Sequence, residues 1–403
     1  MIIVSLILML VIFSGVDCER KITAKLNPGC DNPSLCKDAI LVHVKAEGLD
    51  DTLHHIWDFT WKPSLLLALT EKNTTLNIQW SPFLAGNEDA VKFDSVPKYV
   101  YGVVLDKMIE FNDADDTGYL NETNSDSSYI SLLDTKNFNW KLSNLTNTSG
   151  EATLTVVATD FKDNLINLQK NGTVQITLSA YGAETHGEPL PHLLHSGNAS
   201  QVDLIINGLS PQYNRSRYGL SLLAVSSDSR NSTLPSVNHR KTLDDEHAPG
   251  VFTIEELLTP AVHDKAGGGY LQWRPIVYFS DKREMTNSTE TVQYHVVAPT
   301  SPRSALNHSL LFSALGPQVD DMLTIATNVT FGVAKDGFYN KNQYAAWTMV
   351  TGYGQPPEEH FSMLVMLVLL IGLGLPAIVI LTGTVCLVVR RLQRNKDDFF
   401  LSR

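Results

Sequence analysis

The chain has 403 residues, and its 31 Lys and Arg against 43 Asp and Glu give a formal net charge of −12. An acidic balance of this size disfavours nucleic acid and anionic membrane surfaces as partners. Only four cysteines are present, so a disulfide-rich scaffold is excluded and the fold must depend on its hydrophobic core.

The N-terminal segment from Ile2 to Phe13 is almost wholly apolar, and Val16-Asp17-Cys18 follows it. The run is too short to span a bilayer comfortably. It predicts a signal peptide over residues 1–18, cleaved near Cys18. The alternative is an uncleaved membrane-anchoring N-terminus.

Cys30 and Cys36 bracket five turn-prone residues. They are the two cysteines expected in the mature part of the chain outside the membrane, where an oxidising lumen would pair them. A loop this short can bring the two Cα atoms near the roughly 5.5 Å that a disulfide needs. We therefore predict a Cys30–Cys36 disulfide that adds little to global stability.

Most apolar segments after the N-terminus are short, rich in β-branched and aromatic residues, and bounded by turn residues. They predict an all-β fold of tandem β-sandwich-like domains. Helical signals are weak, and we expect two short helices, over Leu65–Leu69 and Phe252–Leu258. The strand-like segments are Ile40–Lys45, Thr75–Trp80, Tyr99–Ile109, Ala152–Ala158, Thr173–Tyr181, Gln201–Ile206, Tyr218–Val225, Tyr270–Phe279, Val292–Val297 and Leu323–Phe331.

The segment Gly187–Asn198 holds two prolines and two glycines and precedes a new strand-like run. We expect a boundary there, between lumenal β domains over residues 19–190 and 199–355, each of a normal size for one domain. One large sandwich with long loops is the competing interpretation.

Asn-x-Ser/Thr acceptor sites for N-glycans are unusually frequent in the chain, and all of them precede the C-terminal apolar run. Eleven are present, whereas chance would give roughly four. Glycans add bulk and hydration at a protein surface, which suits a protein that must survive among proteases. The acceptors are Asn73, Asn121, Asn144, Asn147, Asn171, Asn198, Asn214, Asn231, Asn287, Asn307 and Asn328.

Residues 361–389 form an apolar run without charge, long enough to cross a bilayer. Basic residues follow at once from Arg390, as at the cytosolic end of a span. The sequence therefore predicts a single-pass type I protein with a lumenal or extracellular N-terminal part and a cytosolic tail, 390–403. Within the span, Gly372, Gly374 and Ala377 would let a partner helix approach closely, although an ordinary lipid-facing anchor is the alternative.

Motifs with a known chemistry are absent: there is no Gly-x-Ser-x-Gly, no His-Glu-x-x-His and no phosphate-binding glycine loop. His192 and His195 would share a face only on a helix, and the prolines beside them favour a solvated loop. His54 and His55 point opposite ways on a strand. The run from Asp244 to His247 is the densest carboxylate group, and we expect Arg274 to pair with it as a structural lock. We therefore predict no catalytic, cofactor or metal site.

Two segments, Asp244–Phe252 and Leu271–Tyr278, resemble the glycosylated lysosomal membrane protein family. The likeness covers essentially the whole chain, and its other marked parts are Leu53–Trp57, Phe138–Trp140, Phe331-Gly332 and Trp347.

This resemblance implies a lysosomal type I protein without established catalytic activity. It implies an accessory subunit that stabilises a multi-spanning transporter of the major facilitator superfamily, one that exports dipeptides, and shields it from lumenal proteases. Family tails can end in a tyrosine-based sorting signal. This tail contains no Tyr, so the partner would have to supply that signal. A lumenal hydrolase with an unrecognised carboxylate site and an adhesion or receptor ectodomain are the alternative functions.

Overall fold

The computed structural model describes most of the chain, and the predicted signal peptide lies outside the described residues. The described ranges are 20–161, 170–244, 250–264, 267–359 and 363–400.

By their internal contacts, the residues form two compact units. One unit contains Met1–Lys241 and Thr253–Pro357, and is referred to below as the ectodomain. The other contains Thr242–Phe252 and Glu358–Arg403 and carries the long C-terminal helix.

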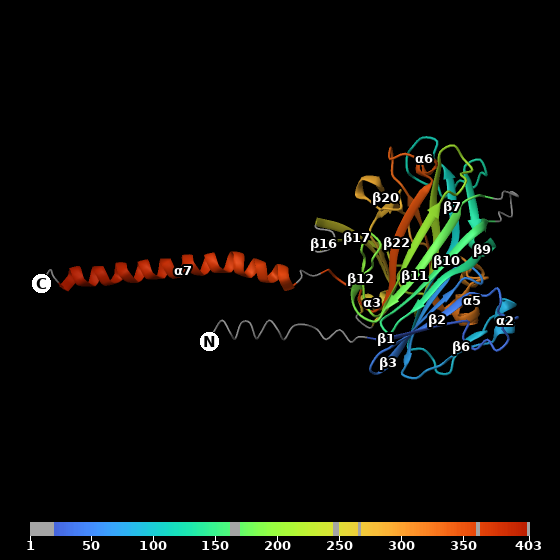
Figure 1. The fold of residues 1–403 in the computed structure, drawn as a ribbon, viewed down its shortest axis with the longest axis horizontal. Helices are drawn as coiled ribbons and strands as arrows, with labels where there is room; N and C mark the ends of the chain where they lie inside the picture. Colours follow the sequence, from blue (N-terminus) through green and yellow to red (C-terminus); the bar gives the residue numbers. More distant parts are fainter. Residues whose placement is uncertain (1–19, 162–169, 245–249, 265–266, 360–362, 401–403) are drawn as a thin grey trace. The chain divides into compact units, whose positions relative to one another are not determined.

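The ectodomain is built from long antiparallel strands (Figure 1), which confirms the all-β prediction. In the first of its two sheets, strands pair in the order β1-β2-β3-β4-β7-β15-β21-β20, and β8 pairs with the end of β7 beyond β4. The bounds are β1 Lys21–Leu26, β2 Leu41–Glu47, β3 Asp51–Asp58, β4 Ser64–Glu71, β7 Tyr99–Asn112, β8 Ile130–Asp134, β15 Ser216–Ser229, β20 Ser288–Gln293 and β21 Met322–Phe331.

In the second sheet, strands pair in the order β9-β10-β11-β14-β22-β18-β17. A short strand, β19, pairs with both β22 and β20 and so joins the two sheets. The bounds are β9 Phe138–Asn147, β10 Glu151–Phe161, β11 Thr173–Tyr181, β14 Ala199–Asn207, β17 Gly250–Leu258, β18 Gly269–Trp273, β19 Ile276–Tyr278 and β22 Tyr344–Tyr353, with β16 at Val237–Asp244.

The main hydrophobic core lies between the two sheets. Side chains alternate along a strand, so every second residue of β10 and β11 points into this core. Leu154 and Val156 on β10 are fully buried, and Ile176 and Leu178 on β11 are nearly so. The threonines between them face the other way, and this alternation explains why the sequence pattern predicted these strands.

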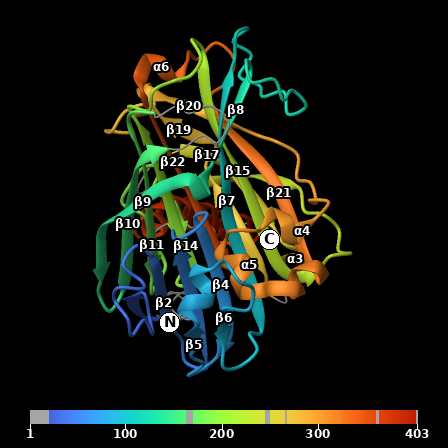
Figure 2. The same cartoon turned by 90° about the vertical axis from the view of Figure 1, so that its right-hand side faces the viewer.

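The first sheet is also covered on its opposite face, by short helices and a hairpin. Leu66 on β4 belongs to the same buried cluster as Phe83 of α2 and Leu311 of α5, and Figure 2 shows α5 beside β4. The elements on this face are β5 Leu76–Ile78, β6 Val91–Phe93, α2 Trp80–Leu84, α4 Pro302–Ala305, α5 Leu310–Leu315 and η4 Gly316–Asp321. The other short helices are α3 Pro260–His263, α6 Tyr339–Asn342, η2 Thr135–Asn137 and η3 Met285–Asn287.

Burial on both faces accounts for one of the two wrong helix predictions. Leu65–Leu69, expected to be a helix, lies in β4, where seven successive residues are buried. A strand covered on both faces has a continuous apolar sequence, which a buried helix segment also has. The second expected helix, Phe252–Leu258, lies in strand β17.

The segment Gly187–Asn198, where we expected a domain boundary, contains part of a second small hairpin, β12 Thr185–His186 with β13 Leu194–His195. Strands β11 and β14 pair directly across this segment. A boundary there would therefore cut through a hydrogen-bonded sheet, and the division into two domains stays a prediction.

The C-terminal helix, α7, runs from Met363 to Phe400. Its part Leu370–Arg391 is long and apolar enough to cross a membrane, as the sequence predicted. Pro376 lies inside the helix.

Candidate functional surface, buried ion pairs and membrane span

The eleven acceptor asparagines all lie at accessible positions of the ectodomain. Nine are exposed and two, Asn198 and Asn328, are half-buried. Most lie in turns and loops, whereas Asn144 and Asn147 lie on β9 and Asn328 lies on β21. An enzyme that transfers glycans needs accessible acceptors, so the geometry is compatible with the prediction of a glycan coat. The attachment itself stays a prediction.

The expected disulfide joins Cys30 and Cys36, whose Cα atoms are 6.6 Å apart. Asn27 holds the same turn, because its Nδ2 donates to the carbonyl oxygens of Cys36 and Ala39. Its Oδ1 accepts from the backbone N–H of Leu41 at the start of β2. The disulfide therefore belongs to a compact cap beside the first sheet.

A buried guanidinium collects three carboxylates from distant parts of the chain. The side chain of Arg217 on β15 is 2% exposed. Its Nε lies 2.6 Å from Asp113, and its two terminal nitrogens lie 2.7 Å from Asp116 and 2.7 Å from Asp336. The guanidinium also lies over the ring of Phe338. It therefore fastens the loop after β7 to the loop after β21.

Two more buried ion pairs hold loops onto the sheets. Lys170 bonds Glu110, whose other oxygen accepts from the hydroxyl of Ser216 at 2.6 Å. Arg283 makes a two-point contact with Asp203 on β14, with nitrogen–oxygen distances of 2.7 and 2.6 Å. Removing one partner of such a pair leaves the other charge buried without a counter-ion, which strongly destabilises the fold.

His54 and His55 point to opposite faces of β3, as expected. On one face His54 Nδ1 lies 2.8 Å from Nε2 of His43, and the two imidazole planes are nearly parallel. On the other face His55 Nδ1 lies 2.8 Å from the hydroxyl of Ser200 in the core between the sheets. Burial lowers the pKa of His43 and of His55 to about 3 and the pKa of His54 to about 4. All three imidazoles are therefore neutral at neutral pH, with a structural role.

The solvated loop expected for His192 and His195 is wrong for His195. Its imidazole is fully buried on β13 and stacks on the ring of Tyr181, with centroids 3.8 Å apart. His192 is half-buried and its Nδ1 lies 2.8 Å from the carbonyl oxygen of Gly187. The two histidines do not form a ligand pair, and the short hairpin that buries one of them has no clear sequence signal.

Arg274 is buried, at 4% exposure, as a structural lock requires. Residues 245–249 lie outside the described part of the chain. The proposed pairing of Arg274 with Asp244–His247 therefore stays a prediction.

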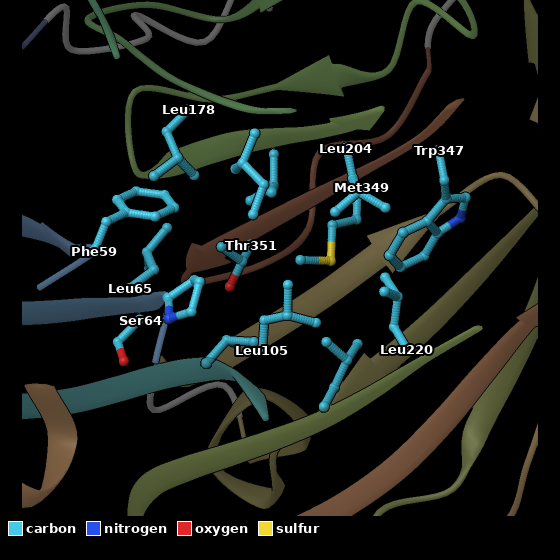
Figure 3. Close-up of a pocket in the computed structure, with 15 residues that line it drawn as sticks. Phe59, Ser64, Leu65, Leu105, Leu178, Leu204, Leu220, Trp347, Met349 and Thr351 are labelled. Carbon is cyan, nitrogen blue, oxygen red and sulfur yellow. The ribbon is translucent and has the colours of Figure 1, made fainter. Parts of the chain in front are cut away.

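The interior between the sheets holds an apolar cavity of about 40 Å³ (Figure 3). Its lining is almost wholly hydrophobic and includes Leu65, Leu204, Leu220 and Met349. That volume is close to that of a single water molecule and too small for a peptide or sugar substrate. Within the described residues, no group of His, Cys, Asp and Glu could hold a metal ion. A larger, half-open pocket of about 340 Å³ is lined by residues that include Arg20, Asp51 and Asn198.

The small residues of the span lie where we expected them, on α7. A contact with another helix there stays a prediction.

The sequence comparisons agree with this architecture. A family model described as glycosylated lysosomal membrane protein matches residues 40–394. Glycosylated lysosomal membrane protein A of Xenopus laevis is 28% identical over 393 residues, covering 94% of this chain and 92% of the relative. The Danio rerio protein of the same family name is 28% identical, covering 93% and 90%, and the Homo sapiens protein is 28% identical, covering 88% and 85%. The chain therefore belongs to the glycosylated lysosomal membrane protein family.

Proposed function

We propose that this chain is a non-catalytic accessory subunit of a multi-spanning transporter in the lysosomal membrane. The partner is a dipeptide exporter of the major facilitator superfamily. The chain stabilises this partner and shields its lumenal side from proteolysis. It is anchored by one span, with its N-terminal part in the lumen.

The observation that carries this proposal is the filled interior of the ectodomain. The apolar cavity of about 40 Å³ between the sheets has no room for a substrate, and the buried ion pairs are satisfied by one another rather than aimed at a ligand. A protein of this kind acts through its surface. The family name of the relatives supports the lysosomal membrane as the place where it acts.

Several features suit an exposed cover in a compartment rich in proteases. Arg217 and Arg283 tie loops to buried carboxylates, and a disulfide closes the turn before β2. Proteases cut where the backbone opens locally, so loops fastened by buried contacts are cut more slowly. Glycans on the exposed asparagines would add a further barrier.

The span supports attachment at a second place. Contact through both the ectodomain and α7 would strengthen binding, because attachment of one part raises the effective concentration of the other. In this proposal, the face of α7 that carries Gly374 and Ala377 lies against a partner helix.

Affinity purification of the full-length chain in mild detergent tests the proposal. We expect a multi-spanning transporter to co-purify and its abundance to fall when the chain is deleted. Gly374→Leu should weaken co-purification, because the added side chain would keep the partner helix from approaching closely. A chain that purifies alone, and whose deletion leaves every lysosomal transporter at normal abundance, contradicts the proposal. A hydrolase would then be the leading alternative, tested by turnover in the purified protein and its loss on Asp245→Asn.

A further inference from the structure

Strand β1 pairs with β2 along one edge. Its other edge is hydrogen-bonded to the second sheet at three successive positions. The backbone N–H of Arg20 donates to the carbonyl oxygen of Gly182 at 2.6 Å, and that of Ile22 donates to Ser149 at 3.1 Å. At the third position no backbone group of β9 reaches β1. The side-chain amide of Asn147 takes its place.

Asn147 binds Ala24 at two points. Its Oδ1 accepts from the backbone N–H of Ala24 at 3.2 Å, and its Nδ2 donates to the carbonyl oxygen of Ala24 at 3.3 Å. The N–H and the C=O of one strand residue point to the same side, so a single carboxamide can satisfy both. The side chain therefore serves as the last rung between β1 and β9.

Asn147 is also an acceptor for N-glycosylation, and the two roles compete for one hydrogen. In a planar carboxamide, a two-point contact uses the oxygen and the Nδ2 hydrogen on the same side as that oxygen. A sugar linked to Nδ2 makes a secondary amide, which strongly prefers the trans form. In the trans form the sugar replaces that same hydrogen. A glycan on Asn147 would therefore remove the bond to Ala24 and lie where β1 lies.

The neighbouring acceptor, Asn144, has no such conflict. Along β9 and β10, Asn147 pairs with Ala152 on the side of the sheet that buries Leu154, whereas Asn144 pairs with Thr155 on the opposite side. Both asparagines are exposed, so exposure alone does not separate them. The direction of the side chain does.

Two other acceptors, Asn121 and Asn198, use their carboxamide oxygen inside the protein, whereas Nδ2 of the acceptor Asn328 donates to Glu122 at 2.6 Å. Asn121 Oδ1 accepts from the backbone and the hydroxyl of Thr123. Asn198 Oδ1 accepts from Nε of Arg20 at 2.6 Å. A linked sugar leaves an oxygen acceptor intact, so these bonds are compatible with modification.

We propose that, of this pair of acceptors, Asn144 carries a glycan and Asn147 stays unmodified, with its carboxamide fastening β1 to β9. The full-length protein made in eukaryotic cells provides the test. Trypsin cuts after Lys141 and Lys162 would release both acceptors in one peptide, in which enzymatic deglycosylation in isotope-labelled water marks each formerly modified Asn. Fragment spectra then assign the mark to Asn144 or to Asn147.

Three variants separate the acceptor from the structural role. Asn144→Gln should lose the mass of one glycan. Ser149→Ala removes the acceptor pattern of Asn147 but keeps its carboxamide, so the attached glycan mass and the stability should not change. Asn147→Gln should keep the attached glycan mass but lose the contacts to Ala24. Trypsin should then cut after Lys21 and Lys25 on β1 roughly five-fold faster, as expected from the loss of about one net hydrogen-bond contribution.

A glycan on Asn147 of the folded parent protein overturns the proposal, as does a loss of attached glycan mass in Ser149→Ala. It is also wrong if Asn147→Gln resists trypsin at Lys21 and Lys25 as well as the parent does. In the same way, Asn144→Gln protein that carries a glycan on Asn147 and keeps the resistance of the parent contradicts the fastening role.

Discussion

His55 on β3 and Ser200 on β14 connect the two sheets across the core, with Nδ1 of the imidazole 2.8 Å from the serine hydroxyl. The indole N–H of Trp57 also donates to this hydroxyl, at 3.3 Å. A neutral imidazole fits this place, because a positive charge between two apolar layers would have no water around it. The sandwich therefore depends on a histidine that must not take up a proton.

Lowering the pH should weaken the ectodomain through His55. Burial is the main cause that lowers the pKa of His55 from 6.5 to about 3, and the positive charge of Arg20 acts in the same direction. Between these two pH values the unfolded chain binds more protons than the folded chain, so stability is present above pH 6.5 and is lost as the pH falls toward 3. His55→Gln should reduce the loss between about pH 7 and pH 4.5 by roughly 2 kcal/mol.

Thermal or denaturant unfolding at the two pH values measures this difference. His295→Gln is the matched control, because His295 lies at an exposed position, and it should leave the difference as in the parent. An unchanged difference in His55→Gln would show that His55 does not govern the acid response.

Asp58 should act in the opposite direction. It is fully buried, and its oxygens accept from the backbone N–H groups of Thr60 at 3.1 Å and Trp61 at 3.4 Å. Burial raises the pKa of Asp58 from 3.8 to about 7. The folded chain therefore binds more protons between these values, so this contribution is present below pH 3.8 and is lost as the pH rises through 7. Asp58→Asn should remove this contribution, so stability should fall more steeply between about pH 7 and pH 4.5 than in the parent. The same unfolding experiment measures the slope, and a profile like that of the parent would contradict the argument.

Removal of the Arg217 guanidinium should be among the most damaging single changes. Arg217→Met would leave Asp113, Asp116 and Asp336 close together without their cation. Breaking a buried pair in this way costs about 3–5 kcal/mol of unfolding free energy. Denaturant unfolding should show this loss. The matched change at a more exposed pair, Arg303→Met beside Glu88, should cost much less, because solvent screens the pair, and equal losses would contradict the argument.

The cavity between the sheets should accept one more methylene group. Val103 lines it, and Val103→Ile should raise the free energy of unfolding by at most about 0.8 kcal/mol. Leu222→Ala, at another lining position, should lower it by about 2–5 kcal/mol because the cavity grows. A marked loss of stability in Val103→Ile would mean that the cavity cannot take the added group.

Local patterns in the sequence predicted much of this protein, because strands, acceptor sites and spans have short-range signatures. The alternation in β11 predicts a half-buried strand, and the run over 361–389 predicts a span. Contacts that depend on tertiary packing have no such signature. Arg217 bonds Asp113 and Asp336 across 104 and 119 residues of sequence, and no pattern near Arg217 indicates either partner. The bond between Asn147 and Ala24 was hidden for the same reason, since the acceptor pattern predicts only a modification.

The anchoring of Arg20 has a practical consequence for handling the protein. This side chain, 10% exposed, binds Asp51 and the carbonyl oxygen of Ala46 at the very start of the described chain. A tag or fluorescent label fused directly before Arg20 would lie close to these bonds and could disturb them at the start of the first strand. Labels for microscopy or capture should therefore be attached beyond Phe400, on the cytosolic side, where the described ectodomain contacts are left intact.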